Sequence, residues 1–208
     1  MLEVLTGSGL AVAAGLNAYI PLLILGLAGR VFDFVALPAG WAWLENPWII
    51  GILGVLLIVE VIADKVPVVD SINDWIQSVV RPAAGGIAFG TGSASETAVV
   101  TDPASFFTSH AWVPVATGIL LAFGTHAAKM LARPALNAAT AGAAAPVVSA
   151  VEDVSSVLLS VMALLVPVIG FVALVGVITL LIFRVRRSRQ TRLAQQQRRI
   201  PLDTPGLR

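Results

Sequence analysis

Residues 60–82 read EVIADKVPVVDSINDWIQSVVRP and place several charged side chains inside an otherwise apolar chain. Glu60 and Asp64 lie four residues apart at the end of an apolar run, so on a helix they share one face. Asp70 and Asp74 repeat this spacing. Carboxylates in apolar surroundings are costly, so these two pairs are the strongest functional feature of the sequence.

The second half of this stretch predicts an amphipathic helix. Apolar residues recur at helical spacing over residues 68–81, and polar or charged residues lie opposite them. The Arg81-Pro82 pair is expected to end this helix, because proline lacks the backbone N–H that a helix needs. We expect residues 68–90 to lie at the membrane interface or to re-enter the membrane.

The composition is that of a membrane protein. Of 208 residues, 57% are hydrophobic and 12% are charged, whereas a soluble domain has about 25% charged residues. Several apolar runs approach the roughly 20 residues that cross a bilayer. The chain has no cysteine, which excludes disulfides, thiolate metal sites and cysteine nucleophiles. These features predict an all-α, polytopic integral membrane helical bundle.

The bundle is expected to have about six membrane-embedded segments in a membrane domain over residues 1–183. They are placed near residues 8–29, 48–65, 68–90, 111–133, 134–151 and 154–183. Residues 184–208 follow as a basic tail that is expected to be largely disordered.

Positive charges predict the orientation. Eight of the 13 Lys and Arg residues lie from Arg184 onward, and residues 91–110 contain none. Because cytoplasmic segments carry an excess of Lys and Arg, we expect both termini in the cytoplasm and residues 91–110 outside. Trp41, Trp43 and Trp48 are typical of an interfacial aromatic belt.

Two further features of the sequence bear on the fold. Asn17 and Pro21 lie inside the first apolar run, and they indicate either a kink with one interhelical hydrogen bond or a kink that lines a polar cavity. An offset of 64 residues aligns Lys65 with Lys129 and Pro82 with Pro146, which indicates a parallel internal repeat.

Four motifs together resemble a known family. They are GLNAYIP at residues 15–21, the E-x3-DK-x-P-x2-D-x3-D pattern from Glu60, the Arg81-Pro82 pair with its following glycine, and SAVED at residues 149–153. This combination resembles the bacterial membrane family catalogued as domain of unknown function 4126, over the chain up to about residue 183. The resemblance implies a small multispan protein of the bacterial inner membrane, and it implies no activity.

The polar residues within the apolar segments are the candidate site. They are Asn17, Glu60, Asp64, Lys65, Asp70, Asp74, Arg81, His126, Lys129, Asn137, Glu152 and Asp153. Three interpretations of Glu60 stay open: a strut paired with Lys129 or Arg81, part of a pathway for a cation or proton, or part of a metal site. His126 either relays protons or makes one hydrogen bond between helices.

Transport or permeation of a small ion or solute is the first functional hypothesis. The second is a structural or accessory subunit of a membrane complex, with membrane lipids and a further copy or another subunit as partners. The third is a Mg²⁺-dependent lipid enzyme, because Asp70 and Asp74 have D-x3-D spacing, but the D-G-x2-A-R context of the CDP-alcohol transferases is absent. We therefore expect no enzyme, no cofactor and no nucleic-acid partner.

Overall fold

The computed structural model describes residues 2–32, 35–64, 67–93, 110, 112–140, 143–165, 173 and 175–184, without the side chains of residues 2, 67–71 and 137. The described residues form helices and no strands, as the sequence predicts. The chain divides into two units, Met1–Phe171 and Val172–Arg208. The first unit contains α1 (Leu2–Leu16), α2 (Tyr19–Val31), η1 (Ala39–Glu45), α3 (Pro47–Ala63), α4 (Pro67–Gly92), α6 (Trp112–Thr140) and α7 (Ala145–Leu165). The second unit contains an apolar helix, Val175–Arg184.

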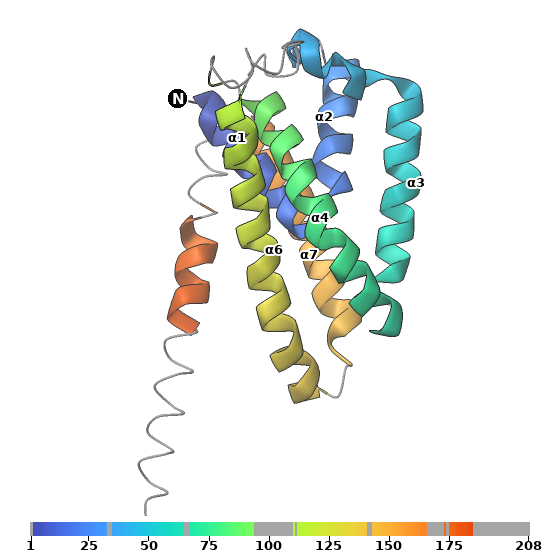
Figure 1. The fold of residues 1–208 in the computed structure, drawn as a ribbon, viewed down its shortest axis with the longest axis vertical. Helices are drawn as coiled ribbons and strands as arrows, with labels where there is room; N and C mark the ends of the chain where they lie inside the picture. Colours follow the sequence, from blue (N-terminus) through green and yellow to red (C-terminus); the bar gives the residue numbers. More distant parts are fainter. Residues whose placement is uncertain are drawn as a thin grey trace, which may run out of the picture. The chain divides into compact units, whose positions relative to one another are not determined.

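Two antiparallel helix pairs run through the first unit. α3 descends and α4 ascends beside it, and α6 descends and α7 ascends (Figure 1). We call the end with the α3–α4 and α6–α7 connections the lower end, as it is drawn in Figure 1. The upper end then holds the start of α1, η1, the end of α4, the start of α6 and the end of α7. α4 packs most extensively against α6 and α1.

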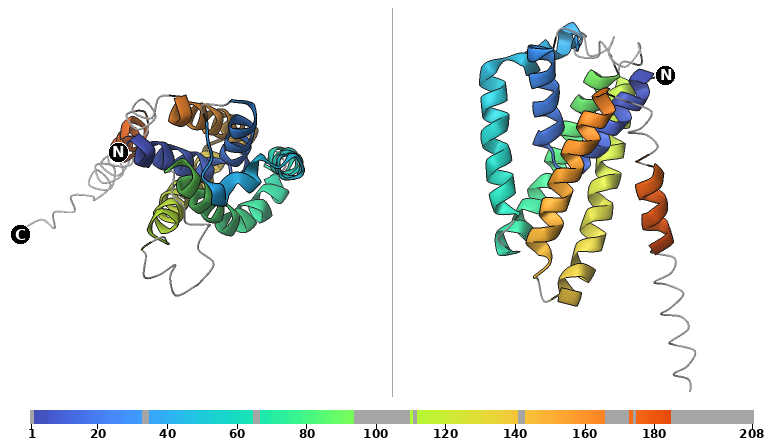
Figure 2. Two further views of the ribbon diagram at one scale, coloured as in Figure 1. Left: turned by 90° about the horizontal axis from the view of Figure 1, so that it is seen from above. Right: turned by 180° about the vertical axis from the view of Figure 1, so that it is seen from behind.

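α1 and α2 form a helical hairpin that enters the bundle from the upper end. Gly7 in α1 lies against Phe89 and Ser93 near the end of α4, whereas Gly15 lies against Thr125, halfway along α6. α2 then returns to η1 at the upper end (Figures 1 and 2). The predicted single span over 8–29 is therefore wrong, because the chain reverses in the middle of that run.

Asn17 explains the reversal. Its Oδ1 accepts hydrogen bonds from the backbone N–H groups of Tyr19 and Ile20, at 3.0 and 3.2 Å, and so caps the start of α2. Pro21 then lies in the first turn of α2, where its missing N–H has no partner to lose.

The hairpin bears on the predicted orientation. Because Gly7 contacts the end of α4, the start of α1 and the start of the segment over 91–110 lie at the same end of the bundle. The expectations of a cytoplasmic N-terminus and an external 91–110 segment are thus incompatible in this fold.

Both Arg-Pro pairs lie inside helices. α4 continues through Pro82 to Gly92, and α6 continues through Pro134 to Thr140. The expected helix end at Pro82 and the separate spans over 111–133 and 134–151 are therefore wrong. Packing against neighbouring helices allows a buried helix to tolerate proline.

The remaining boundaries also change. α7 begins at Ala145 rather than near residue 154. Residues 68–90 belong to α4, which runs the length of the bundle, whereas the α1–α2 hairpin enters and leaves the bundle at its upper end (Figure 1). The offset of 64 residues would set the α3–α4 connection against the middle of α6, so the aligned residues do not occupy equivalent places.

Small residues let three helices approach closely. A Cβ atom added to Gly118 of α6 would collide with the backbone carbonyl of Gly85 in α4. One added to Gly15 of α1 would lie 2.6 Å from the carbonyl oxygen of Ala122 in α6. Such contacts are typical of helices that pack in membranes.

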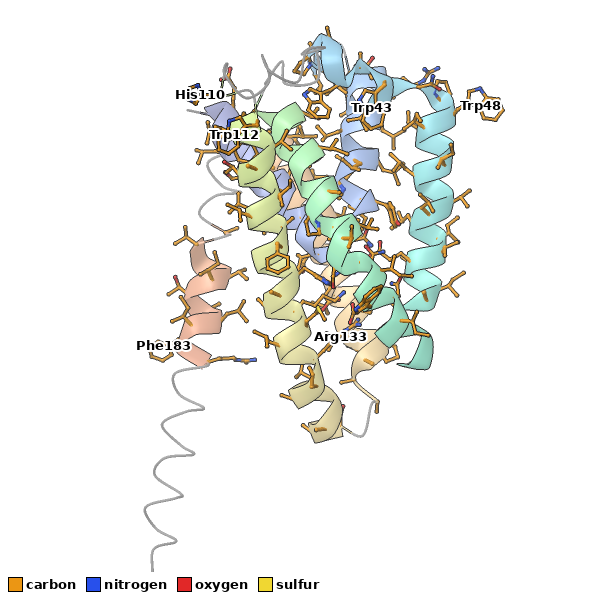
Figure 3. The ribbon with its side chains drawn as sticks, in the orientation of Figure 1. Trp43, Trp48, His110, Trp112, Arg133 and Phe183 are labelled. Carbon is orange, nitrogen blue, oxygen red and sulfur yellow. The ribbon has the colours of Figure 1, made fainter. Side chains whose placement is uncertain are left out.

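The outer surface is apolar. By length and composition, α6 and α7 could each cross a membrane, and η1 with α3, bent by 63°, could form a third span among the described residues. The exposed face of α3 carries a shallow groove of about 420 Å³ lined by Trp48, Gly51, Ile52, Val55 and Leu56. Trp43, Trp48 and Trp112 are exposed at the upper end (Figure 3), whereas Trp41 is buried.

Candidate functional site

A buried cluster of charged side chains occupies the lower half of the bundle. It draws on α3, α4, α6 and α7, and Arg133 marks its position in Figure 3. The members are Glu60, Asp64, Asp74, Arg81, His126, Lys129, Arg133 and Glu152. We call this group the charged cluster.

Asp64 at the end of α3 is its centre. Its Oδ2 lies within 4.0 Å of cationic nitrogens of all three basic residues of the charged cluster. Its Oδ1 accepts a hydrogen bond from Asn73 at 2.7 Å, and Ser149 donates to Oδ2 at 3.3 Å. Asp64 thus joins α3 to α4, α6 and α7.

Arg81 joins the charged cluster to the hairpin. Its Nη2 donates to Oε1 of Glu60 at 2.9 Å, and both side chains are buried. Its Nη1 donates to the carbonyl oxygen of Gly15, at the end of α1, at 3.4 Å. A cation suits this position, because the last carbonyls of a helix are unpaired and partly negative. Of the two partners expected for Glu60 as a strut, Lys129 and Arg81, the ion pair is formed with Arg81.

Lys129 and Arg133 form the lower layer. Lys129 Nζ lies 2.7 Å from Oε2 of Glu152, and Arg133 Nη1 donates to Oδ2 of Asp74 at 3.0 Å. The side chains of Asp74 and Glu152 are 12% and 13% exposed, against 1% for Glu60. Asp74 and Glu152 are therefore the most exposed carboxylates of the charged cluster, since Asp64 is 2% exposed.

His126 bridges α6 and α4. Its Nδ1 faces Arg81 Nη1 at 3.3 Å, and its Nε2 faces Ser78 Oγ at 3.1 Å. Arg can only donate, so Nδ1 accepts, and Nε2–H donates to Ser78, which itself donates to the Asp74 carbonyl. This network fits a neutral His126, and it matches the predicted hydrogen bond between helices.

The tip of the hairpin contacts α7. Asn17 donates from Nδ2 to Oδ1 of Asp153 at 2.9 Å, and Asn17 is fully buried. Asp153 therefore has a neutral partner, at the top of the charged cluster.

Two buried oxygen atoms next to the hairpin tip accept no hydrogen bond from the described residues. They are Oε2 of Glu60 and Oε1 of Gln77, and both residues are 2% exposed. Gln77 precedes Arg81 by four residues, so it lies one turn below it on the same face of α4. Two acceptors without a donor leave room in the hydrogen-bonding scheme for a proton or a cation.

The charge count points the same way. Among the described side chains, the charged cluster holds four carboxylates against three permanent cations. A surplus negative charge at this depth is costly, and one bound proton or monovalent cation would remove it.

Most of the predicted residues come together here. The predicted polar face of α4 is confirmed: Asp74, Gln77 and Arg81 are buried, whereas Trp75 and Val79 are exposed. Lys65 and the side chains of Asp70 and Asn137 lie outside the described part of the chain.

Sequence reasoning missed Arg133 as a member of the site. It is the last residue of the segment expected over 111–133, yet His126, Lys129 and Arg133 have the three- and four-residue spacing of one helix face. That spacing could have revealed it.

The carboxylates do not form a metal site among the described residues. Asp74 turns Oδ2 to Arg133 and Oδ1 to Lys129, at 3.0 and 3.9 Å. Cations at these distances oppose binding of Mg²⁺, whose ligands are oxygens.

Comparison with known proteins returned one family. The family model described as "Domain of unknown function (DUF4126)" matches residues 4–187. This range includes every helix of the first unit, apart from the first two residues of α1. No curated protein and no solved structure matches the chain.

Proposed function

This chain belongs to the DUF4126 family, and from that starting point we propose that it is a small membrane permeation protein that moves a proton or a monovalent cation by way of Glu60. The observation that carries the proposal is the buried Oε2 of Glu60, which has no partner in the described residues at the point where the hairpin meets the charged cluster.

The hairpin supports this proposal. Non-helical backbone at membrane depth is tolerated only where it is buried in protein or lines a polar cavity, and re-entrant segments are a feature of channels and transporters. Here the turn between α1 and α2 lies next to Arg81 and Asp153. The start of α2, which carries a partial positive charge, therefore faces the same region as Glu60.

The exposure of the carboxylates favours a route from the lower end to Glu60. Asp74 and Glu152 are the most exposed carboxylates of the charged cluster, Asp64 is 2% exposed, and the side chain of Glu60 is the most buried at 1%. The side chains of Arg81, Lys129 and Arg133 lie between these carboxylates. They would hold the other carboxylates in place while one of them binds the proton or cation.

We place the protein in a bacterial inner membrane with the lower end towards the cytoplasm. The start of α1 would then be outside. The Arg-rich tail is expected in the cytoplasm on its own charges, because it holds eight of the 13 Lys and Arg residues. Cysteine substitution tests this arrangement cleanly, because the chain has no cysteine. An impermeant thiol reagent on intact cells should label Leu5→Cys and Ser95→Cys but not Ser188→Cys; labelling of Ser188→Cys alone would reverse the orientation.

The functional test is Glu60→Gln in the full chain, reconstituted in liposomes. Glutamine keeps the shape and most hydrogen bonds but cannot ionise, so flux of protons and monovalent cations should stop while the protein stays folded. Glu3→Gln, at an exposed position in the first turn of α1, is the control. A Glu60→Gln protein that melts early yet conducts as well as the wild type would defeat this proposal.

A structural role is the second candidate, and the extent of pairing favours it. Each basic side chain of the charged cluster contacts at least two carboxylates. In that role the cluster would hold the four long helices together in a membrane complex, with lipids and further subunits on the apolar outer face. Absence of any ion flux from the wild-type protein would favour this role.

A further inference from the structure

A row of hydroxyl groups leads upward from the charged cluster along α7. Ser149, Ser156 and Ser160 of α7 are fully buried, and α7 packs extensively against α1 (Figure 2, right). Their spacing, with Glu152 and Asp153 between them, keeps them on one face of the helix. The row therefore connects the acidic lower half with the upper half.

Individual contacts link this row of hydroxyl groups to the charged cluster and to the α1–α2 hairpin. Ser149 donates to Asp64, Asn17 donates to Asp153, and Ser156 donates to the carbonyl oxygen of Ala13 at 2.9 Å. Ser160, one turn further up, is fully buried, and its Oγ bonds to none of the described residues. A buried hydroxyl without a partner indicates an occupant such as water.

The seam between α1 and α7 is narrow. A Cβ atom added to Gly9 would lie 2.7 Å from the Cβ of Ala163, and Ala13 and Ala163 are fully buried. A hydrated metal cation would not fit between helices at this separation. A chain of hydroxyls linked by single waters needs less space than a hydrated cation, because each hydroxyl or water accepts a proton on a lone pair and releases one that it carried.

We propose that the permeating species is a proton, and that it travels above Glu60 along the α1–α7 seam through Asp153, Ser156 and Ser160. This inference rests on the proposed function and names its substrate. One helical turn is about 5.4 Å, so a single water between successive side chains completes each step. No bond other than O–H is made or broken, and one proton leaves the top of the row for each one that enters.

The test compares proton flux with K⁺ flux in liposomes that contain the full chain. Ser160→Ala should lower proton flux about tenfold, as expected for the loss of one hydrogen-bonded step. Ser160→Thr, which keeps the hydroxyl, should restore most of the flux. Ser155→Ala, at the half-buried neighbouring position on another face of α7, should leave flux unchanged.

Melting temperatures measured on the same preparations separate a lost relay from a lost fold. Proton flux that depends on Glu60 but is unchanged in both Ser156→Ala and Ser160→Ala would overturn this path and leave the proposed function standing. K⁺ flux as fast as proton flux would overturn the assignment of the proton. No flux of either ion would overturn the path and the proposed function together.

Discussion

The upper and lower halves of the bundle are stabilised in different ways. In the upper half, α1, α4 and α6 meet through glycine and alanine, and their backbones are in contact at Gly85 and Gly118. In the lower half α3, α4, α6 and α7 are joined by arginine, lysine and carboxylates. The upper half is therefore sensitive to an added atom at these glycines, and the lower half is sensitive to the loss of a charged partner.

This difference predicts which kind of substitution destabilises each half. Close packing is lost by adding a methyl group, because the interior has no space to receive it. A buried ion pair is lost by removing one partner, because the other is left charged and without compensation. The predictions below test this division, from the largest expected effect to the smallest.

Arg81→Met should cause the greatest loss of stability. It removes the partner of Glu60 and the donor to the Gly15 carbonyl, and breaking a buried pair costs about 3–5 kcal/mol. Thermal melting in detergent would measure the change. The double variant Glu60→Gln, Arg81→Met should melt above Arg81→Met, since no unpaired carboxylate is left. A double variant that melts lower still would contradict the ion-pair account.

Gly118→Ala should have an intermediate effect. The added methyl meets the Gly85 backbone and the side chain of Phe89, and overpacking costs about 1–3 kcal/mol. Gly124→Ala on the same helix is the matched control, because nothing lies within 4 Å of its added Cβ. It should melt at the same temperature as the wild type or higher. Equal destabilisation by both substitutions would mean that α6 is not held by close packing.

The sequence predicts the lower half better than the upper half. Charges in an apolar chain are few, so the buried face of α4 follows from spacing, and only Lys129 and Arg81 were expected as partners of Glu60. The glycine contacts do not follow, because a glycine facing a helix and one facing outward look alike in sequence; Gly118 and Gly124 are an example.

The two largest errors have local causes. Pro82 predicts a helix end from backbone chemistry, but packing on both sides of α4 keeps the helix intact. Asn17 has the opposite effect: its side chain caps α2 inside an apolar run that hydropathy alone treats as continuous. In both places side chain or tertiary contacts override the local pattern.

Asn17→Ala tests the point where the two halves meet. It removes the cap of α2 and the partner of Asp153, so the cost should exceed the roughly 1 kcal/mol of an ordinary cap. Asn46→Ala provides the comparison, because Asn46 caps α3 through the N–H of Trp48 at an exposed position. Melting temperatures should fall more for Asn17→Ala. An equal fall in both would show that the contact with Asp153 adds nothing.

Gly51→Ala should have the smallest effect, and its sign tests what covers the outer face of α3. Nothing lies within 4 Å of the added Cβ, so alanine should raise stability by up to about 1 kcal/mol through helix propensity alone. That result is expected if the groove lined by Trp48, Ile52 and Val55 faces lipid. If a second copy of the chain packs there, glycine would be needed for close approach, as it is at Gly118. Gly51→Ala would then lower the melting temperature and shift the protein to a smaller species in size-exclusion chromatography, and α3 would have to be grouped with the closely packed helices of the upper half.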